Sequence, residues 1–219
     1  MAETITTYDL VKPDLALPME RDAFYAEQIK AFETTGKPTK AAGVVAVIIF
    51  NELGELLIQQ RSSKKNHNAG LFDKSIGGHI QYGDTEEYTV MVETVQELQV
   101  PSITLKTDED FQKTLKVLKE YLNTVAIVKH IDTLIWQLEK VFQVGRIPIA
   151  NKLHLFFGIY SGAVKNVDRE ARGVLFYSLE ELQKELEKSP ERFSDDIHYL
   201  MTHRLADMQN FISQFQQVI

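Results

Sequence analysis

The stretch GGHIQYGDTEEYTVMVETVQELQV, residues 77–100, decides how the fold of this chain is interpreted. It begins with a glycine-rich loop, which lets the backbone approach a ligand closely. Asp84 and Glu87 then form the pattern of a capping box, which predicts a helix from Asp84 to about Leu98, before Pro101. The N-terminus of a helix favours anions. The segment therefore predicts a ligand-binding loop joined to a helix.

Acidic residues mark one face of this helix. Glu86, Glu93 and Glu97 stand at positions i, i+7 and i+11, which lie on about the same side. Glu93 and Glu97 are one turn apart, and two like charges at that spacing destabilise a helix by roughly a few tenths of a kcal/mol. A hard divalent cation would reverse this effect because it prefers oxygen ligands. A solvated helix face is the plainer interpretation of the same residues.

The rest of the chain alternates between strand and helix patterns. Strands are predicted at Val44–Phe50, which is apolar on both faces, and at Glu55–Arg61, Lys152–Ser161 and Val174–Tyr177. Helices are predicted at residues 19–34, at 178–188 after a second capping box, and at about 195–216. The three-to-four spacing of apolar residues over 108–143 predicts two further helices, with a break near Asn123. This order predicts an α/β fold, an α/β/α sandwich over a mixed sheet.

Composition narrows the class of protein. The chain has 219 residues, 44% of them hydrophobic, with a net charge of −7 and no cysteine. One embellished soluble domain is expected at this length. The negative charge argues against nucleic-acid or anionic-membrane partners, and the absence of cysteine excludes thiol nucleophiles and thiolate metal sites. The first residues carry no signal-peptide pattern, so we expect a cytoplasmic protein.

Residues 78–100 resemble the box of the Nudix hydrolase superfamily. That signature is Gly, five residues, Glu, seven residues, then Arg-Glu-aliphatic-x-Glu-Glu-x-Gly-aliphatic. Four positions match, and Asp84 stands in for the first Glu; the matches are Gly78, Glu93, Glu97 and Val100. Four positions depart: Val92 replaces Arg, Thr94 an aliphatic residue, Gln96 a metal-binding Glu, and Gln99 the final Gly.

The resemblance extends to residues 41–100 and 150–200, including the strand at Leu56–Ser62 and the turn at Ala69–Asp73. It divides the chain into an N-terminal extension with a helix at 1–40 and a Nudix-like domain at 41–219, interrupted by a helical insertion at about 102–146. We expect the insertion to pack as a helical subdomain and to contribute to a homodimer. Its apolar residues motivate this expectation: Leu115, Leu118, Leu122, Ile131, Leu134 and Leu138.

The resemblance implies a divalent-metal-dependent hydrolase of a nucleoside-diphosphate-linked or other organic pyrophosphate. Glu93 and Glu97 would be the catalytic metal ligands, with Mg²⁺ or Mn²⁺ as the cofactor. The residues expected to contact the diphosphate substrate are Arg61, Lys64, Lys65, Gly78 and His79. Glu170 is a possible fourth carboxylate, although a surface position is the better expectation. Tyr82 and Phe72 would stack on a base or, as is more usual, pack inward.

Two alternatives follow from the departures. The loop Ser75–His79 also resembles isopentenyl-diphosphate isomerase, a branch of the same superfamily. That enzyme requires a cysteine where this chain has Gly77, so we reject the isomerase chemistry. Val92 and Gln96 favour a catalytically inactive Nudix-like module that binds a ligand or partner, whereas Glu93 and Glu97 favour the hydrolase.

Overall fold

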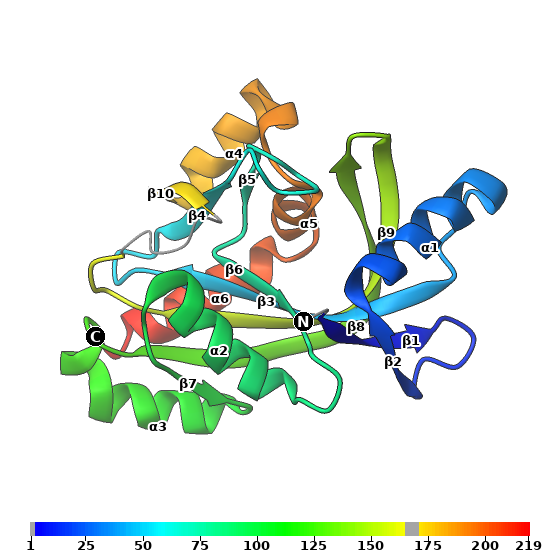
Figure 1. Ribbon diagram of the computed structural model, residues 1–219. Coiled ribbons are helices and arrows are strands. Elements are labelled where there is room, and N and C mark those ends of the chain that lie inside the picture. Colours follow the sequence, from blue (N-terminus) through cyan, green and yellow to red (C-terminus); the bar gives the residue numbers. More distant parts are fainter. Residues whose placement is uncertain (1–2, 165–170) are drawn as a thin grey trace.

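Strand β3 (Lys40–Phe50) is the centre of the fold, and its sequence is apolar because both faces of its sheet are covered. Val45, Val47 and Ile49 point to one side and Ile48 and Phe50 to the other, all of them fully buried. Figure 1 shows the computed structural model, which describes residues 3–164 and 171–219. The alternation of side chains along a strand thus supplies two cores from one segment.

The sheet is mixed. Its order is β10 (Ala171–Tyr177), β4 (Leu56–Arg61), β3, β9 (Gly145–Ile159), β8 (Ala126–Phe142) and β7 (Ser102–Leu105). β3 pairs in parallel with β9, and most of the other pairs are antiparallel. Short strands extend the other edges of β3 and β4, namely β1 (Thr4–Asp9), β2 (Ala16–Glu20), β5 (Phe72–Asp73) and β6 (Ile76–His79). β6 places the glycine-rich loop directly beside β3.

Helices cover the two faces of the sheet unequally. α2 (Glu86–Leu98) packs on one face through Val90 and Leu98. The other face holds α3 (Asp108–Leu118), α4 (Leu179–Lys188), α5 (Asp195–His203) and α6 (Leu205–Gln216), with the short turns Lys119–Tyr121 and Pro190–Arg192. α1 (Arg21–Thr35) lies beside the distal half of the β8–β9 hairpin (Figure 1). The arrangement is a mixed α/β fold with helices on both faces of a mixed sheet, as the sequence predicts.

The prediction of a second helix over 108–143 is wrong, because residues Ala126–Phe142 form strand β8. A register shift between His130 and Asp132 explains the error. Ile127, before the bulge, and Ile131, the extra residue within it, face one core; after the bulge, even-numbered residues such as Leu134 and Leu138 do. The bulge therefore creates a three-residue spacing between apolar positions, which imitates a helix.

The segment 102–146 is consequently not a helical subdomain. It contributes strands β7 and β8 to the main sheet, and only its first half is helical. The six apolar residues that suggested an unpaired surface are either buried in the core or packed against it. They therefore supply no argument for a homodimer.

Three smaller predictions also need correction. Thr85, not Asp84, caps α2, and its hydroxyl accepts a hydrogen bond from the backbone N–H of Tyr88. The final helix predicted at about 195–216 is divided into α5 and α6 at Arg204. The N-terminal segment carries the β1–β2 hairpin as well as the expected helix. No helix in the parts of the chain described here is long and apolar enough to cross a membrane.

Candidate functional site

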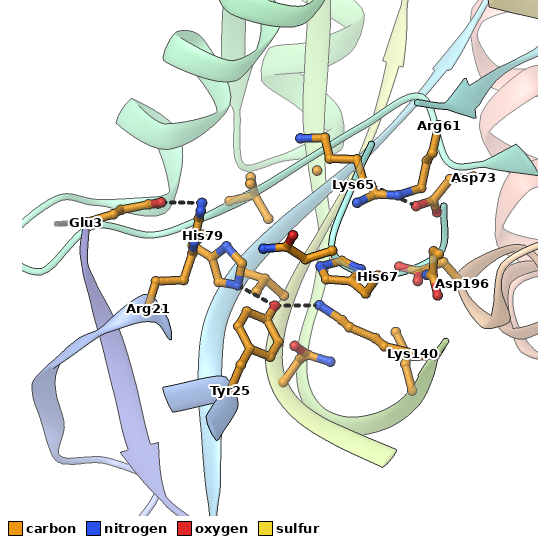
Figure 2. A pocket seen from close by; sticks show the side chains of 18 of the residues that line it. Glu3, Arg21, Tyr25, Arg61, Lys65, His67, Asp73, His79, Lys140 and Asp196 are labelled. Carbon is orange, nitrogen blue, oxygen red and sulfur yellow. Dashed lines mark hydrogen bonds and ion pairs between the residues drawn. The ribbon is translucent and has the colours of Figure 1, made fainter. Parts of the chain in front are cut away.

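A cavity of about 880 Å³ opens where the glycine-rich loop, α2, α1 and the β8–β9 hairpin meet (Figure 2). All seven residues that the sequence singles out for a site line this one cavity: Arg61, Lys64, Lys65, Gly78, His79, Glu93 and Glu97. They come from four separate elements or loops. The structure thus brings together residues that the sequence spreads over 37 positions, from 61 to 97.

Glu93 lies against the backbone of Gly78. A Cβ atom added at Gly78 would be only 2.0 Å from Oε1 of Glu93 and 2.6 Å from its Cγ. Real Cβ atoms do not approach other atoms so closely. The glycine that begins the box is therefore needed because the carboxylate of Glu93 occupies the space of a side chain at position 78.

Glu97 is held by two groups from neighbouring strands. The side-chain amide of Gln59 on β4 donates to Oε2 of Glu97 at 2.7 Å, and the backbone N–H of Gly77 donates to Oε1 at 3.4 Å. Gln59 is buried and also donates to the backbone carbonyl of Ser75. These bonds orient the carboxylate of Glu97 next to the glycine-rich loop, one helical turn from Glu93.

The departures from the box have different structural consequences. Thr94 is fully buried at the aliphatic position, and its hydroxyl bonds to the carbonyl of Met91 and to Oγ of Ser102 at 2.9 Å. Gln99 replaces the final glycine in a left-handed conformation, with φ 56° and ψ 34°. Gln96 is exposed and lines the cavity, as does Val92. Thr94 is thus accommodated, whereas Gln99 is strained and Gln96 changes the charge of the site.

Arg61 belongs to a buried network of charges at one wall of the cavity. Its Nη1 donates to Asp73 at 3.3 Å, and Ser194 donates to the same carboxylate at 2.7 Å. Nζ of Lys74 lies 2.5 Å from Asp196. Burial raises the pKa of Asp73, but Lys74 and Arg61 outweigh this effect and hold that pKa below its usual range. Asp196 and Asp73 likewise raise the pKa of Lys74 despite its burial.

The other predicted substrate contacts differ in their surroundings. Lys64 is exposed at the mouth of the cavity, and Lys65 is half-buried beside it. Nε2 of His79 is hydrogen-bonded to the hydroxyl of Tyr25, at 2.9 Å. Burial, followed by the nearby charge of Lys140, keeps the pKa of His79 well below its ordinary value. His79 is therefore neutral near pH 7.

Several residues of the cavity were not predicted from the sequence. Tyr25 comes from α1, Lys140 and Asn151 from β8 and β9, and His67 from the long loop. The sequence does not single out Lys140 as a site residue, because its segment has the apolar spacing of a helix, in which a lysine is expected to be exposed. In a strand of alternating pattern, a buried lysine would have been conspicuous.

Three further residues that the sequence considers, Glu86, Tyr82 and Phe72, do not line the cavity. Glu86 points instead toward His154, with 3.9 Å between Oε1 and Nδ1. Tyr82 is exposed, and Phe72 packs inward against Phe193, their ring centroids 5.5 Å apart. Glu170 lies outside the residues that the structure describes.

The carboxylates suit a hard cation that is bound mainly through its substrate. Within the described ranges, no group of three or more acidic or histidine side chains is arranged to hold a metal ion. Mg²⁺ is commonly bound by one or two carboxylates, with water and substrate phosphates completing its shell. Glu93 and Glu97 line the same cavity and would be two such carboxylates.

Comparison with known proteins gives the family. The NUDIX domain family matches residues 39–197, most of the chain, so the protein belongs to the Nudix family. An isopentenyl-diphosphate Delta-isomerase from Serratia proteamaculans (strain 568) is 23% identical over 149 residues, which is 68% of each chain.

Comparison with a solved structure supports the fold. DR0079 from Deinococcus radiodurans aligns with a TM-score of 0.52 and 16% identity, over 73% of this chain and 80% of that one. The NUDIX domain of Shewanella oneidensis NrtR, solved in complex with ADP ribose, aligns with a TM-score of 0.45 and 14% identity. That alignment covers 87% of this chain and 99% of the NrtR domain.

Proposed function

We propose that this protein is a divalent-metal-dependent hydrolase of a nucleoside-diphosphate-linked compound or another organic pyrophosphate. One observation carries the proposal: Glu93, Glu97 and the basic residues of the long loop line a single cavity beside a glycine-rich turn. Membership of the Nudix family supports the same class of reaction. The isomerase reaction is not proposed, because the chain has no cysteine.

Glu93 and Glu97 would hold Mg²⁺ or Mn²⁺, which when bound supplies a Lewis acid for the diphosphate and a lowered pKa for the attacking water. The bonds from Gln59 and Gly77 to Glu97 fix one carboxylate before a ligand arrives. Lys64 and Lys65 would bind phosphate oxygens by charge-assisted hydrogen bonds. Nη1 of Arg61 is already hydrogen-bonded to Asp73. Arg61 would therefore add positive charge beside these lysines rather than a direct bond from Nη1 to the phosphate.

The test is a hydrolysis screen over many organic diphosphates, with and without Mg²⁺ or Mn²⁺, in which the phosphate monoesters produced by cleavage of the diphosphate are quantified by chromatography. Glu93→Gln and Glu97→Gln should lower metal-dependent turnover by orders of magnitude while the thermal unfolding temperature stays close to that of the wild type. Glu120→Gln is the matched control, because Glu120 is exposed on the turn after α3, away from the cavity.

Wild-type turnover in both cavity variants would refute the assignment of Glu93 and Glu97. Absence of turnover on every diphosphate tested, with either metal, would instead favour the binding module. The exposed Gln96 at a metal-binding position of the family signature is the observation on that side.

A further inference from the structure

Lys140 places a buried ammonium group in the lining of the cavity. The residue is 9% exposed, and its Nζ donates to the hydroxyl of Tyr25 at 2.9 Å and lies 5.2 Å from the centre of that ring. Within residues 3–164 and 171–219, no carboxylate forms an ion pair with it. An ammonium group in such a place is costly unless an anion compensates for it.

The partners of Lys140 do not supply that compensation. The Tyr25 hydroxyl accepts from Lys140 and is hydrogen-bonded to Nε2 of His79, whose pKa is held well below its ordinary value by burial (Figure 2). His67 is also near Lys140, and burial lowers its pKa, so that it too is neutral. These three neighbours of the ammonium, a phenol and two neutral imidazoles, carry no negative charge.

Unused polar atoms line the same cavity. Asn151 is only 2% exposed, yet its Oδ1 has no hydrogen-bond partner among the described residues. Nδ1 of His67 is likewise buried without a partner. Buried polar atoms are normally hydrogen-bonded, so each of these atoms has room for a further partner, which a ligand group or a water molecule would supply. Lys140 itself has two donors left after its bond to Tyr25.

We propose that Lys140, together with His67 and Asn151, forms a second anion-binding site that receives a phosphate group of the ligand. The ammonium would bind the phosphate oxygens, and Oδ1 of Asn151 would accept from a hydroxyl or N–H of the ligand. This deepens the proposed function and rests on it for the diphosphate itself: the substrate would be an organic diphosphate that carries a further phosphate group. Glu93 and Glu97 are not part of this second site.

The test measures phosphate binding without metal or turnover. Inorganic phosphate is titrated by calorimetry into wild-type protein and Lys140→Met, in buffer freed of divalent cations by a chelating resin. The wild type should bind phosphate, and Lys140→Met should bind it at least tenfold more weakly. Lys113→Met, which removes an exposed lysine from α3, is the control and should bind like the wild type.

Thermal unfolding distinguishes a binding role from a structural one. Without phosphate, Lys140→Met should melt no lower than the wild type, because methionine retains the apolar stem and removes an uncompensated charge. Phosphate should raise the melting temperature of the wild type but not of the variant. A lower melting temperature of the variant with an unchanged phosphate response would show that Lys140 only holds Tyr25, and would overturn the proposal.

The result is independent of hydrolysis. The double variant Glu93→Gln/Glu97→Gln should still bind phosphate under these conditions, even though it is expected to lose turnover. Failure of the wild type to bind phosphate would overturn the second site and leave the proposed hydrolase unaffected. Phosphate binding by the wild type without turnover of any diphosphate would support the second site and contradict the proposed hydrolase.

Discussion

The carboxylate of Glu93 occupies the position that a side chain at Gly78 would need, with Oε1 2.0 Å from an added Cβ. The two residues belong to different elements, β6 and α2, and their contact joins the glycine-rich loop to the acidic helix. The loop and the helix must therefore change together if either is altered.

Gly78→Ala should separate the function of the site from the stability of the fold. The new methyl group displaces the flexible side chain of Glu93 and not a backbone segment. The free energy of unfolding should therefore fall by only about 1 kcal/mol. Metal-dependent turnover should fall at least tenfold. Activity and urea denaturation measure the two effects.

Gly173→Ala is the control, because a Cβ at Gly173 on β10 meets no atom within 4 Å. It should change neither quantity appreciably. Full activity of Gly78→Ala would mean that the position of Glu93 is not important for catalysis.

Gln96→Glu should restore a carboxylate at the metal-binding position of the box. Without metal, the variant should be less stable than the wild type, since the new charge stands near Glu93 and Glu97. Mg²⁺ should reverse this deficit, because its affinity rises with the number of charged ligands and binding stabilises the native state. Val92→Arg added to this change should increase the effect.

Thermal unfolding and hydrolysis, each with and without Mg²⁺, check the prediction. Gln209→Glu on α6 adds the same charge at an exposed position away from the cavity and serves as control. If Mg²⁺ has no effect on either property of Gln96→Glu, the helix does not face a cation.

Gln99→Gly should stabilise the protein. Gln99 ends α2 with φ 56°, a left-handed conformation that costs other residues about 1–2 kcal/mol relative to glycine. Glycine loses more chain entropy on folding, so the net gain should be about 0.5–1 kcal/mol. Urea denaturation should show a higher midpoint with an unchanged slope. Gln99→Ala should give no such gain, and an equal gain would contradict the role of φ.

Stability should fall as the pH falls below about 6.5, the ordinary pKa of histidine. Burial lowers the pKa of His67 and His79, so the unfolded chain takes up protons that the folded chain does not. Stability is therefore fully present above pH 6.5, and each histidine removes up to about 1.4 kcal/mol per pH unit below it. Urea denaturation between pH 7.5 and about 5 measures this slope.

His67→Gln and His79→Gln should each reduce the slope by the contribution of one proton. His198→Gln, which alters a residue outside the cavity, is the reference variant. An unchanged slope in both cavity variants would show that these imidazoles do not stay neutral in the folded protein.

The sequence predicts the centre of the fold well, because β3 and α2 obey simple periodicities. It fails at β8, where the bulge near Ile131 turns an alternating pattern into a helical spacing. Periodicity depends on an unbroken register, and one extra residue is enough to mislead it.

The site divides in the same way. The signature brings out Glu93 and Glu97, and the basic residues follow from their loop. Tyr25 and Lys140 are absent from the signature and 115 positions apart, so only tertiary structure shows that they are hydrogen-bonded. Wherever a site is assembled from distant segments by pairing across a sheet, local patterns identify only the part that lies on one element.

The parallel pairing of β3 with β9 has a consequence for synthesis of the chain on the ribosome. Ala41 pairs with Ala150 and Phe50 with Ile159, so the partner of each β3 residue is synthesised about 110 positions later. At roughly 5–20 residues per second, this delay lasts on the order of 5 to 20 seconds. During that time the apolar run Val44–Phe50 has no neighbour on its β9 side, so the nascent chain exposes an unpaired hydrophobic strand, which favours aggregation.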